Sequence, residues 1–153
     1  MPRHQQGNIS FEVPRHWQDR TIVAFAAPSR PGVSTAASFV MTRDSLTETD
    51  TLATYADRQL AELSKRVDGF ELVEKRETTI GGARAVSLRF TSKALAGPLL
   101  QRLVIVEDRR RAVACFTATA PKADGAQLEP LFDRMLAGIR LADPDAPAAE
   151  DTE

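Results

Sequence analysis

The residues of this chain that could act in catalysis or bind a metal are few and far apart. The histidines are His4 and His16, and the one cysteine is Cys115. A zinc-type site needs several such ligands at short spacings, and a nucleophilic cysteine needs a base beside it. Cys115 instead stands between Ala114 and Phe116 in a strand-like segment, which favours a small core residue. We therefore expect no catalytic residue, no metal ligand and no cofactor.

Three charged or glycine-rich segments have ordinary structural explanations. Asp44, Glu48 and Asp50 precede the first predicted helix, where carboxylates cap a helix or interact with its dipole. The arginines at 109–111 fit an exposed turn better than a nucleic-acid site, because no aromatic residues are interleaved with them. The glycine pair at 81–82 lacks the lysine and hydroxyl residue of a phosphate-binding loop and predicts a tight hairpin instead.

Composition and charge describe an ordinary globular chain. Of its 153 residues, 42% are hydrophobic and 27% charged, so it can bury a core without disulfides or metals. The 20 basic and 21 acidic side chains nearly cancel, which gives no electrostatic reason to expect nucleic acid as a partner. The N-terminus lacks the apolar core of a signal peptide, and no segment approaches the ~18 apolar residues of a spanning helix. We expect a cytoplasmic protein that does not insert into membranes.

Apolar periodicity predicts two helices. The first runs from about Thr51 to Val67, with Asp50 or Thr49 as its N-cap, and the second from about Gln127 to Ile139. Segments with strand character lie at 8–13, 21–27, 36–43, 70–80, 83–92, 99–107 and 112–120.

The order of these segments predicts an α+β fold with a largely antiparallel sheet, because hairpins connect most strands. A loop is expected near 29–32 and a charged turn at 108–111. The two helices are expected to cover about one face of the sheet and to leave the other face exposed. Residues 1–142 are expected to form a single domain, followed at 143–153 by a disordered acidic tail.

Two glutamines stand where apolar residues are expected. On a helical wheel Gln59 falls between Tyr55 and Leu63, inside the apolar stripe, and Gln101 shares a strand face with Leu103. An amide in such a place must find hydrogen-bond partners or lie at an opening. Either these are core amides bonded to nearby groups, or they point into a groove that binds another polypeptide.

Small side chains recur on the faces of two early strands. A sheet face built from Ile22, Ala24, Ser38, Val40 and Thr42 is apolar but shallow, and small residues let another backbone approach closely. Such a face suits an apolar helix rich in small residues. The alternative is that this face packs on the protein's own helix or on a second copy.

Five segments, taken in order and spacing, resemble a known family. They are Trp17-Gln18-Asp19-Arg20, Ser38-Phe39-Val40-Met41-Thr42-Arg43-Asp44, Tyr55 with Arg58-Gln59-Leu60, Gln101-Arg102, and Thr117-Ala118-Thr119-Ala120-Pro121. The chain is similar through them to the DcrB-like superfamily and, within it, to the Eag chaperones of type VI secretion systems. The resemblance implies a curved antiparallel sheet with helices packed against it, and a homodimer.

The same resemblance implies a function and a binding site. Eag chaperones bind the N-terminal transmembrane segments of effector proteins and shield them until the effector is loaded on the VgrG spike. The implied site is a sheet groove of small and apolar residues, with glutamines that reach the bound helix. By position, its residues here are Ile22, Ala24, Ser38, Val40, Thr42, Gln59 and Gln101. The competing expectation is a non-catalytic adaptor of the same fold that binds a soluble protein partner.

Overall fold

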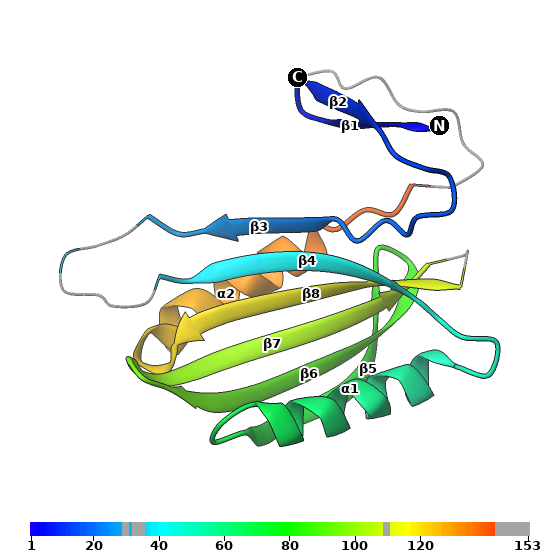
Figure 1. The fold of residues 1–153 in the computed structure, drawn as a ribbon. Coiled ribbons are helices and arrows are strands. Elements are labelled where there is room, and N and C mark those ends of the chain that lie inside the picture. Colours follow the sequence, from blue (N-terminus) through cyan, green and yellow to red (C-terminus); the bar gives the residue numbers. More distant parts are fainter. Residues whose placement is uncertain (29–30, 32–35, 109–110, 143–153) are drawn as a thin grey trace.

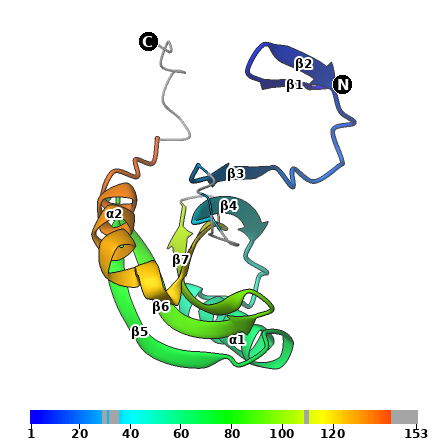
Figure 2. The same cartoon turned by 90° about the vertical axis from the view of Figure 1, so that its left-hand side faces the viewer.

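A computed structural model describes residues 1–28, 31, 36–108 and 111–142 (Figure 1). It shows the expected α+β fold, in which helices pack against a curved antiparallel sheet (Figure 2). The predicted tail at 143–153, and parts of the loop predicted at 29–32 and of the turn predicted at 108–111, lie outside the described residues. No helix within the described ranges is long and apolar enough to cross a membrane.

The main sheet has six strands in the order β3-β4-β8-β7-β6-β5, and all its pairings are antiparallel. Its strands are β3 (Ile22–Ala26), β4 (Ser38–Ser45), β5 (Glu71–Ile80), β6 (Ala83–Ala94), β7 (Gly97–Glu107) and β8 (Ala112–Pro121). The helices are α1 (Leu52–Arg66), a short 3-10 helix (Lys122–Asp124) and α2 (Gly125–Ala137). A separate hairpin is formed by β1 (Arg3–Gln6) and β2 (Ile9–Glu12), and β1 was not among the predicted strands.

The expectation that both helices cover one face of the sheet is wrong. Side chains alternate between the faces of a strand, and the core under α1 contains Leu103 and Ile105 of β7, whereas the core under α2 contains Val104 and Val106. The helices therefore pack on opposite faces. Figure 2 shows α1 inside the curve of the sheet and α2 outside it. We call these the concave and convex faces.

Burial on both faces explains why β7 has a continuous apolar run rather than an alternating one. The four residues at 103–106 are all buried, because one helix covers each face of the sheet at this point. The tight hairpin predicted at 81–82 is present, with both glycines at positive φ (58° and 82°), which glycine adopts without strain.

The N-cap of α1 is Thr51, not Asp50 or Thr49. Its side-chain oxygen accepts a hydrogen bond from the backbone N–H of Thr54, whose hydroxyl in turn accepts one from the backbone N–H of Thr51. This reciprocal pair satisfies two of the free N–H groups at the helix start. The carboxylate of Asp50 is not available for capping, because Arg58 and the backbone N–H of Thr47 bind it.

Candidate binding groove

The seven predicted binding residues lie on or beside one surface of the sheet. The register identifies this surface, because Thr42 of β4 lies opposite Cys115 of β8, which lies opposite Ile105 of β7. Cys115 and Ile105 belong to the core under α1, which lies on the concave face. Side chains alternate between the two faces of a strand, so residues two or four positions away on the same strand, and the residues paired with them on neighbouring strands, also face the concave side. Those of the predicted set are Ile22, Ala24, Ser38, Val40, Thr42 and Gln101, while Gln59 is carried by α1 itself.

These residues belong to three rows that cross the strands. The rows are Ala26–Ser38–Thr119–Gln101, Ala24–Val40–Thr117–Leu103 and Ile22–Thr42–Cys115–Ile105. Their members on β3 are exposed, those on β4 are half-buried, and Leu103, Cys115 and Ile105 are buried under α1. The helix packs mainly on β6 and β7 and leaves the β3 end of each row open. We call the uncovered part, formed by β3, β4 and the C-terminal half of β8, the open floor.

The helix α1 forms a wall along one side of the open floor, with Gln59 on the side nearest to it. Tyr55 marks that side, because its hydroxyl donates a hydrogen bond to Asp44 of β4 (2.9 Å) and lies 3.8 Å from the sulfur of Cys115 on β8. Gln59 follows Tyr55 by one helical turn on the same side. It is half-buried, and no hydrogen bond joins its amide to any described residue. Its amide is thus available to a ligand.

Gln101 is held differently. The hydroxyl of Ser92 donates to its side-chain oxygen (3.0 Å), and its amide nitrogen donates to the hydroxyl of Thr119 (3.2 Å). These three hydrogen-bonded side chains extend from the covered part of the sheet, where Ser92 is buried, to the open floor, where Thr119 is half-buried. The amide keeps one N–H and one lone pair for a further partner.

Sequence reasoning missed three residues of the open floor, Ala26, Thr117 and Thr119. The two threonines continue the face of β8 that begins with Val113 and Cys115, so the floor has more hydroxyl groups than predicted. A period-two change from apolar residues to threonine along one strand face is the signal that could have identified them. It indicates the point where the covering helix ends and the face becomes accessible.

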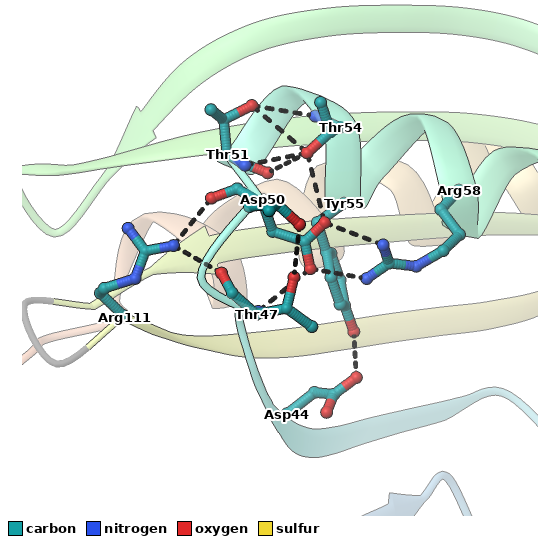
Figure 3. A network of polar contacts seen from close by, with 9 residues as sticks. Asp44, Thr47, Asp50, Thr51, Thr54, Tyr55, Arg58 and Arg111 are labelled. Carbon is teal, nitrogen blue, oxygen red and sulfur yellow. Dashed lines mark hydrogen bonds and ion pairs between the residues drawn. The ribbon is translucent and has the colours of Figure 1, made fainter.

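A polar network fixes the first turn of α1 to the sheet (Figure 3). The carboxylate of Asp50 is buried at 6% exposure and receives two N–H groups of Arg58, at 2.8 and 2.9 Å. Arg111, at the start of β8, donates to the backbone carbonyls of Thr47 (2.6 Å) and Asp50 (2.9 Å). Arg111 thus stabilises the turn before α1 and has a structural role in this network. With the Tyr55–Asp44 bond, these contacts place the helix that forms the groove wall.

The hydrogen bonds from Arg58 and from the backbone of Thr47 hold the pKa of the Asp50 carboxyl far below its usual range. A lowered folded-state pKa means that the folded protein prefers the ionised carboxylate. This contribution to stability is fully present above the unfolded pKa of about 3.9 and is lost as pH falls through the lower, folded value.

Asp50→Asn should therefore melt several degrees below the wild type at pH 7, and the difference should narrow below about pH 4. Calorimetry of both proteins between pH 7 and pH 3 measures this difference in melting temperature. A difference that stays constant with pH would contradict the lowered pKa of Asp50.

Cys115 is the one side chain of the sequence with a thiol. Cys115 is buried, as expected from the sequence, and burial raises the pKa of its thiol, which keeps it protonated. The structure, over the ranges it describes, contains no group of three or more His, Cys, Asp or Glu placed to hold a metal ion. The arrangement of the open floor and Gln59 is suited to binding an extended apolar surface.

Known proteins resemble this chain in sequence and in fold. The DcrB family model matches residues 9–138 of the chain. The Pseudomonas aeruginosa PAO1 protein named effector EagT6 is 34% identical over 136 residues, which are 89% of this chain and 93% of that protein. The solved structure of PA94 from Pseudomonas aeruginosa, described as a protein of unknown function and putative regulator, has a TM-score of 0.78 at 29% identity. The matched region covers 94% of this chain and 98% of the PA94 chain.

A more distant likeness concerns the fold alone. LpqN of Mycobacterium tuberculosis, described as involved in cell envelope biogenesis, has a TM-score of 0.54 at 16% identity over 77% of this chain and 82% of its own.

The resemblance inferred from the sequence is confirmed by the family match and by the identity to EagT6. This chain belongs to the DcrB family and, within it, to the Eag-type proteins.

Proposed function

We propose that this protein is a type VI secretion chaperone that binds the N-terminal transmembrane helices of an effector in the cytoplasm. It shields them from water until the effector is loaded on the VgrG spike. The observation that carries this proposal is the open floor: a concave sheet surface of small and apolar side chains beside a helix whose Gln59 amide has no hydrogen bond to any described residue. The family membership supports the same function.

The chemistry of the open floor matches that of a transmembrane helix with small residues. Ala24, Ala26 and Ser38 have side chains short enough for a helix backbone to approach closely, as in helix pairs within membranes. Val40 and Ile22 supply apolar contact, and Ile22 is 66% exposed in the absence of a ligand. Hydroxyl and amide groups at the edges of the floor can bond the few polar groups of such a helix.

The hydrophobic effect supplies enough free energy for such a complex. Burying ~1,000 Å² of apolar surface at ~25 cal/mol per Å² contributes roughly 25 kcal/mol before the losses from ordering and association. A shallow surface can therefore hold an apolar helix tightly, provided that few polar groups are left unpaired. Ile22, Ala24, Ala26 and Val40 fit this requirement, because their side chains carry no polar group.

Co-expression with the N-terminal apolar segment of a candidate type VI effector tests the proposal. If the segment remains in solution only with this protein and the two co-elute in size-exclusion chromatography with light scattering, the proposal stands. If the segment is in solution by itself, or never co-elutes, the protein is not a chaperone for transmembrane helices. Binding of the effector through a water-soluble domain only would instead favour the adaptor function.

The two glutamines should contribute unequally to binding. Gln59→Ala removes an amide that has no partner among the described residues, so the protein should keep its melting temperature while it loses about tenfold in affinity for the segment. Gln101→Ala also leaves Ser92 and Thr119 without their partner and should lower the melting temperature. Calorimetry and titration of a detergent-solubilised segment separate the two effects. Unchanged affinity in both variants would show that these amides serve only the protein's own structure.

A further inference from the structure

The N-terminal hairpin β1–β2 has one polar face and one apolar face. Side chains of residues paired across two antiparallel strands lie on the same face of the pair. Arg3 and Ser10 lie on the polar face, where the guanidinium of Arg3 donates a hydrogen bond to the hydroxyl of Ser10 (2.8 Å). Ile9 and Phe11 lie on the other face, where the ring centroid of His4 is 5.3 Å from that of Phe11. The hairpin is thus amphipathic.

The apolar face of this hairpin is uncovered. Ile9 is 63% and Phe11 48% exposed, and Trp17, in the segment that joins the hairpin to β3, is 66% exposed. At roughly 200 Å² for a large side chain, these three leave on the order of 350 Å² of apolar surface in water, a size at which a patch on a soluble protein is often functional. A lone two-stranded hairpin is also marginally stable in water, so this face needs a cover.

The rest of the chain does not supply that cover. We call residues 1–21 the N-terminal arm. Among the described residues, the hydrogen bonds of the arm stay within it. The N–H of Val13 donates to the carbonyl of Pro2 (3.0 Å), and that of Trp17 to the carbonyl of Pro14 (3.1 Å). Both views show the hairpin beyond β3 and away from α1 and α2 (Figure 1, Figure 2).

A helix seated on the open floor would have an uncovered side as well. The open floor spans three strands, about 10 Å across, and a helix with its side chains is about 10–12 Å in diameter. The floor and the α1 wall therefore touch two sides of such a helix, and the side that points away from the sheet stays in water. Apolar side chains on that side gain nothing from the floor, because the hydrophobic effect scales with the area removed from water.

We propose that the apolar face of the N-terminal arm is a second binding surface, which covers the side of the effector helix that the open floor leaves in water. This inference rests on the proposed function, because it takes an apolar helix to lie on the floor. The chemistry of the two surfaces agrees: Ile9, Phe11 and Trp17 carry no charge, and they complement the apolar side chains of a membrane-spanning segment.

The connection of the arm to the sheet fits this role. The arm leads directly into Ile22, which is itself an exposed residue of the floor, so the two apolar surfaces are continuous along the chain. The linker at 13–21 can extend over roughly 30 Å, whereas the floor from Ser38 to Thr42 is only about 14 Å long. The hairpin can therefore reach across a helix on the floor, with Arg3 and the rest of its polar face turned to water.

Trp17 reports on the arm, because it is the one tryptophan of the sequence. The probe is the N-terminal apolar segment of a candidate type VI effector, with any tryptophan replaced by phenylalanine, co-expressed with the full chain. Without the segment, the indole of Trp17 should emit as in water and be quenched freely by iodide. In the co-eluting complex its emission should shift to shorter wavelength, and most of the quenching by iodide should be lost.

A substitution on the apolar face gives a second, independent measurement. Phe11→Ser should keep the melting temperature of the wild type, because Phe11 is exposed, but should lose about tenfold in affinity for the segment. Leu95→Ser is the matched control: Leu95 is also exposed but lies at the turn that follows β6, so this variant should bind like the wild type. Titration of the detergent-solubilised segment measures both affinities.

Failure of this inference differs from failure of the proposed function. If the segment co-elutes while Trp17 stays as accessible to iodide as before, the floor binds the helix without the arm, and only the inference is overturned. Trp17 shielded in the protein alone would overturn it too, because something else, such as a second copy, then covers the arm. Equal affinities of Phe11→Ser and the wild type would do the same. If no segment co-elutes at all, the proposed function fails and the inference with it.

Discussion

A carboxylate in the middle of the open floor, Val40→Glu, should abolish capture of the effector segment. Val40 lies between Ala24 and Thr117 in the central row, on the concave face and half-buried. An apolar helix seated there would bury the glutamate without a partner, which costs several kcal/mol, so affinity should fall by ~100-fold or more. Co-elution of the segment with the variant should therefore disappear.

The matched control is the same substitution on the β5 edge of the sheet. Val73 of β5 is 52% exposed and far from the open floor in the strand order, so Val73→Glu should capture the segment like the wild type. Melting curves of both variants show whether each remains folded. If Val40→Glu stays folded and still co-elutes with the segment, the helix does not bind on this surface, and the site proposed here is wrong.

Phe90→Ala should produce the largest loss of stability among the substitutions considered. Phe90 is 2% exposed in the core under α1, and the centroid of its ring lies 5.0 Å from that of Phe70. Removing a buried phenylalanine side chain leaves a cavity and costs about 3–5 kcal/mol, a large part of the ~5–15 kcal/mol that stabilises a domain of this size. Chemical denaturation should show this as a lower midpoint with a similar slope.

This substitution also connects the core to the groove. Phe90 lies opposite Gln101 in the register and belongs to the cluster that holds α1, so a cavity there loosens both the wall and the floor. The comparison is Leu95→Ala, at the exposed turn that follows β6, which should leave the free energy of unfolding nearly unchanged. Equal midpoints for Phe90→Ala and the wild type would show that the core under α1 does not carry the stability assigned to it.

Much of the fold could be predicted because its signals are local. The apolar stripe of α1, the alternation of Ile9, Phe11 and Val13 and the glycine pair at 81–82 each depend on neighbours a few residues away. Of the β1–β2 hairpin, only β2 was predicted, because the polar segment of β1 has no apolar alternation. The turn between the two strands, Gly7-Asn8, is nevertheless a recognisable two-residue turn signal.

Non-local contacts could not be read from the pattern. The apolar stripe of a helix shows that one side is buried, but not against which face of the sheet, and so α1 and α2 were assigned to one face when they occupy two. The pairing of β4 with β8 brings together strands that are separated in the chain by α1 and three strands. The Asp50–Arg58 pair spans eight residues, beyond the three or four that face each other on a helix.

The sequence by itself determined the order of the elements, the small and apolar character of residues 22–26 and 38–42, and the presence of two glutamines among apolar neighbours. These are properties of side chains and of their spacing along the chain. Only the tertiary structure decided that Thr117 and Thr119 join the floor and that α1 covers the β6–β7 side of the concave face. It also decided that Gln101 is hydrogen-bonded, whereas the amide of Gln59 has no partner among the described residues. The physical reason is that strand register and helix docking are set by the packing of the whole core, which no local stretch of the chain determines.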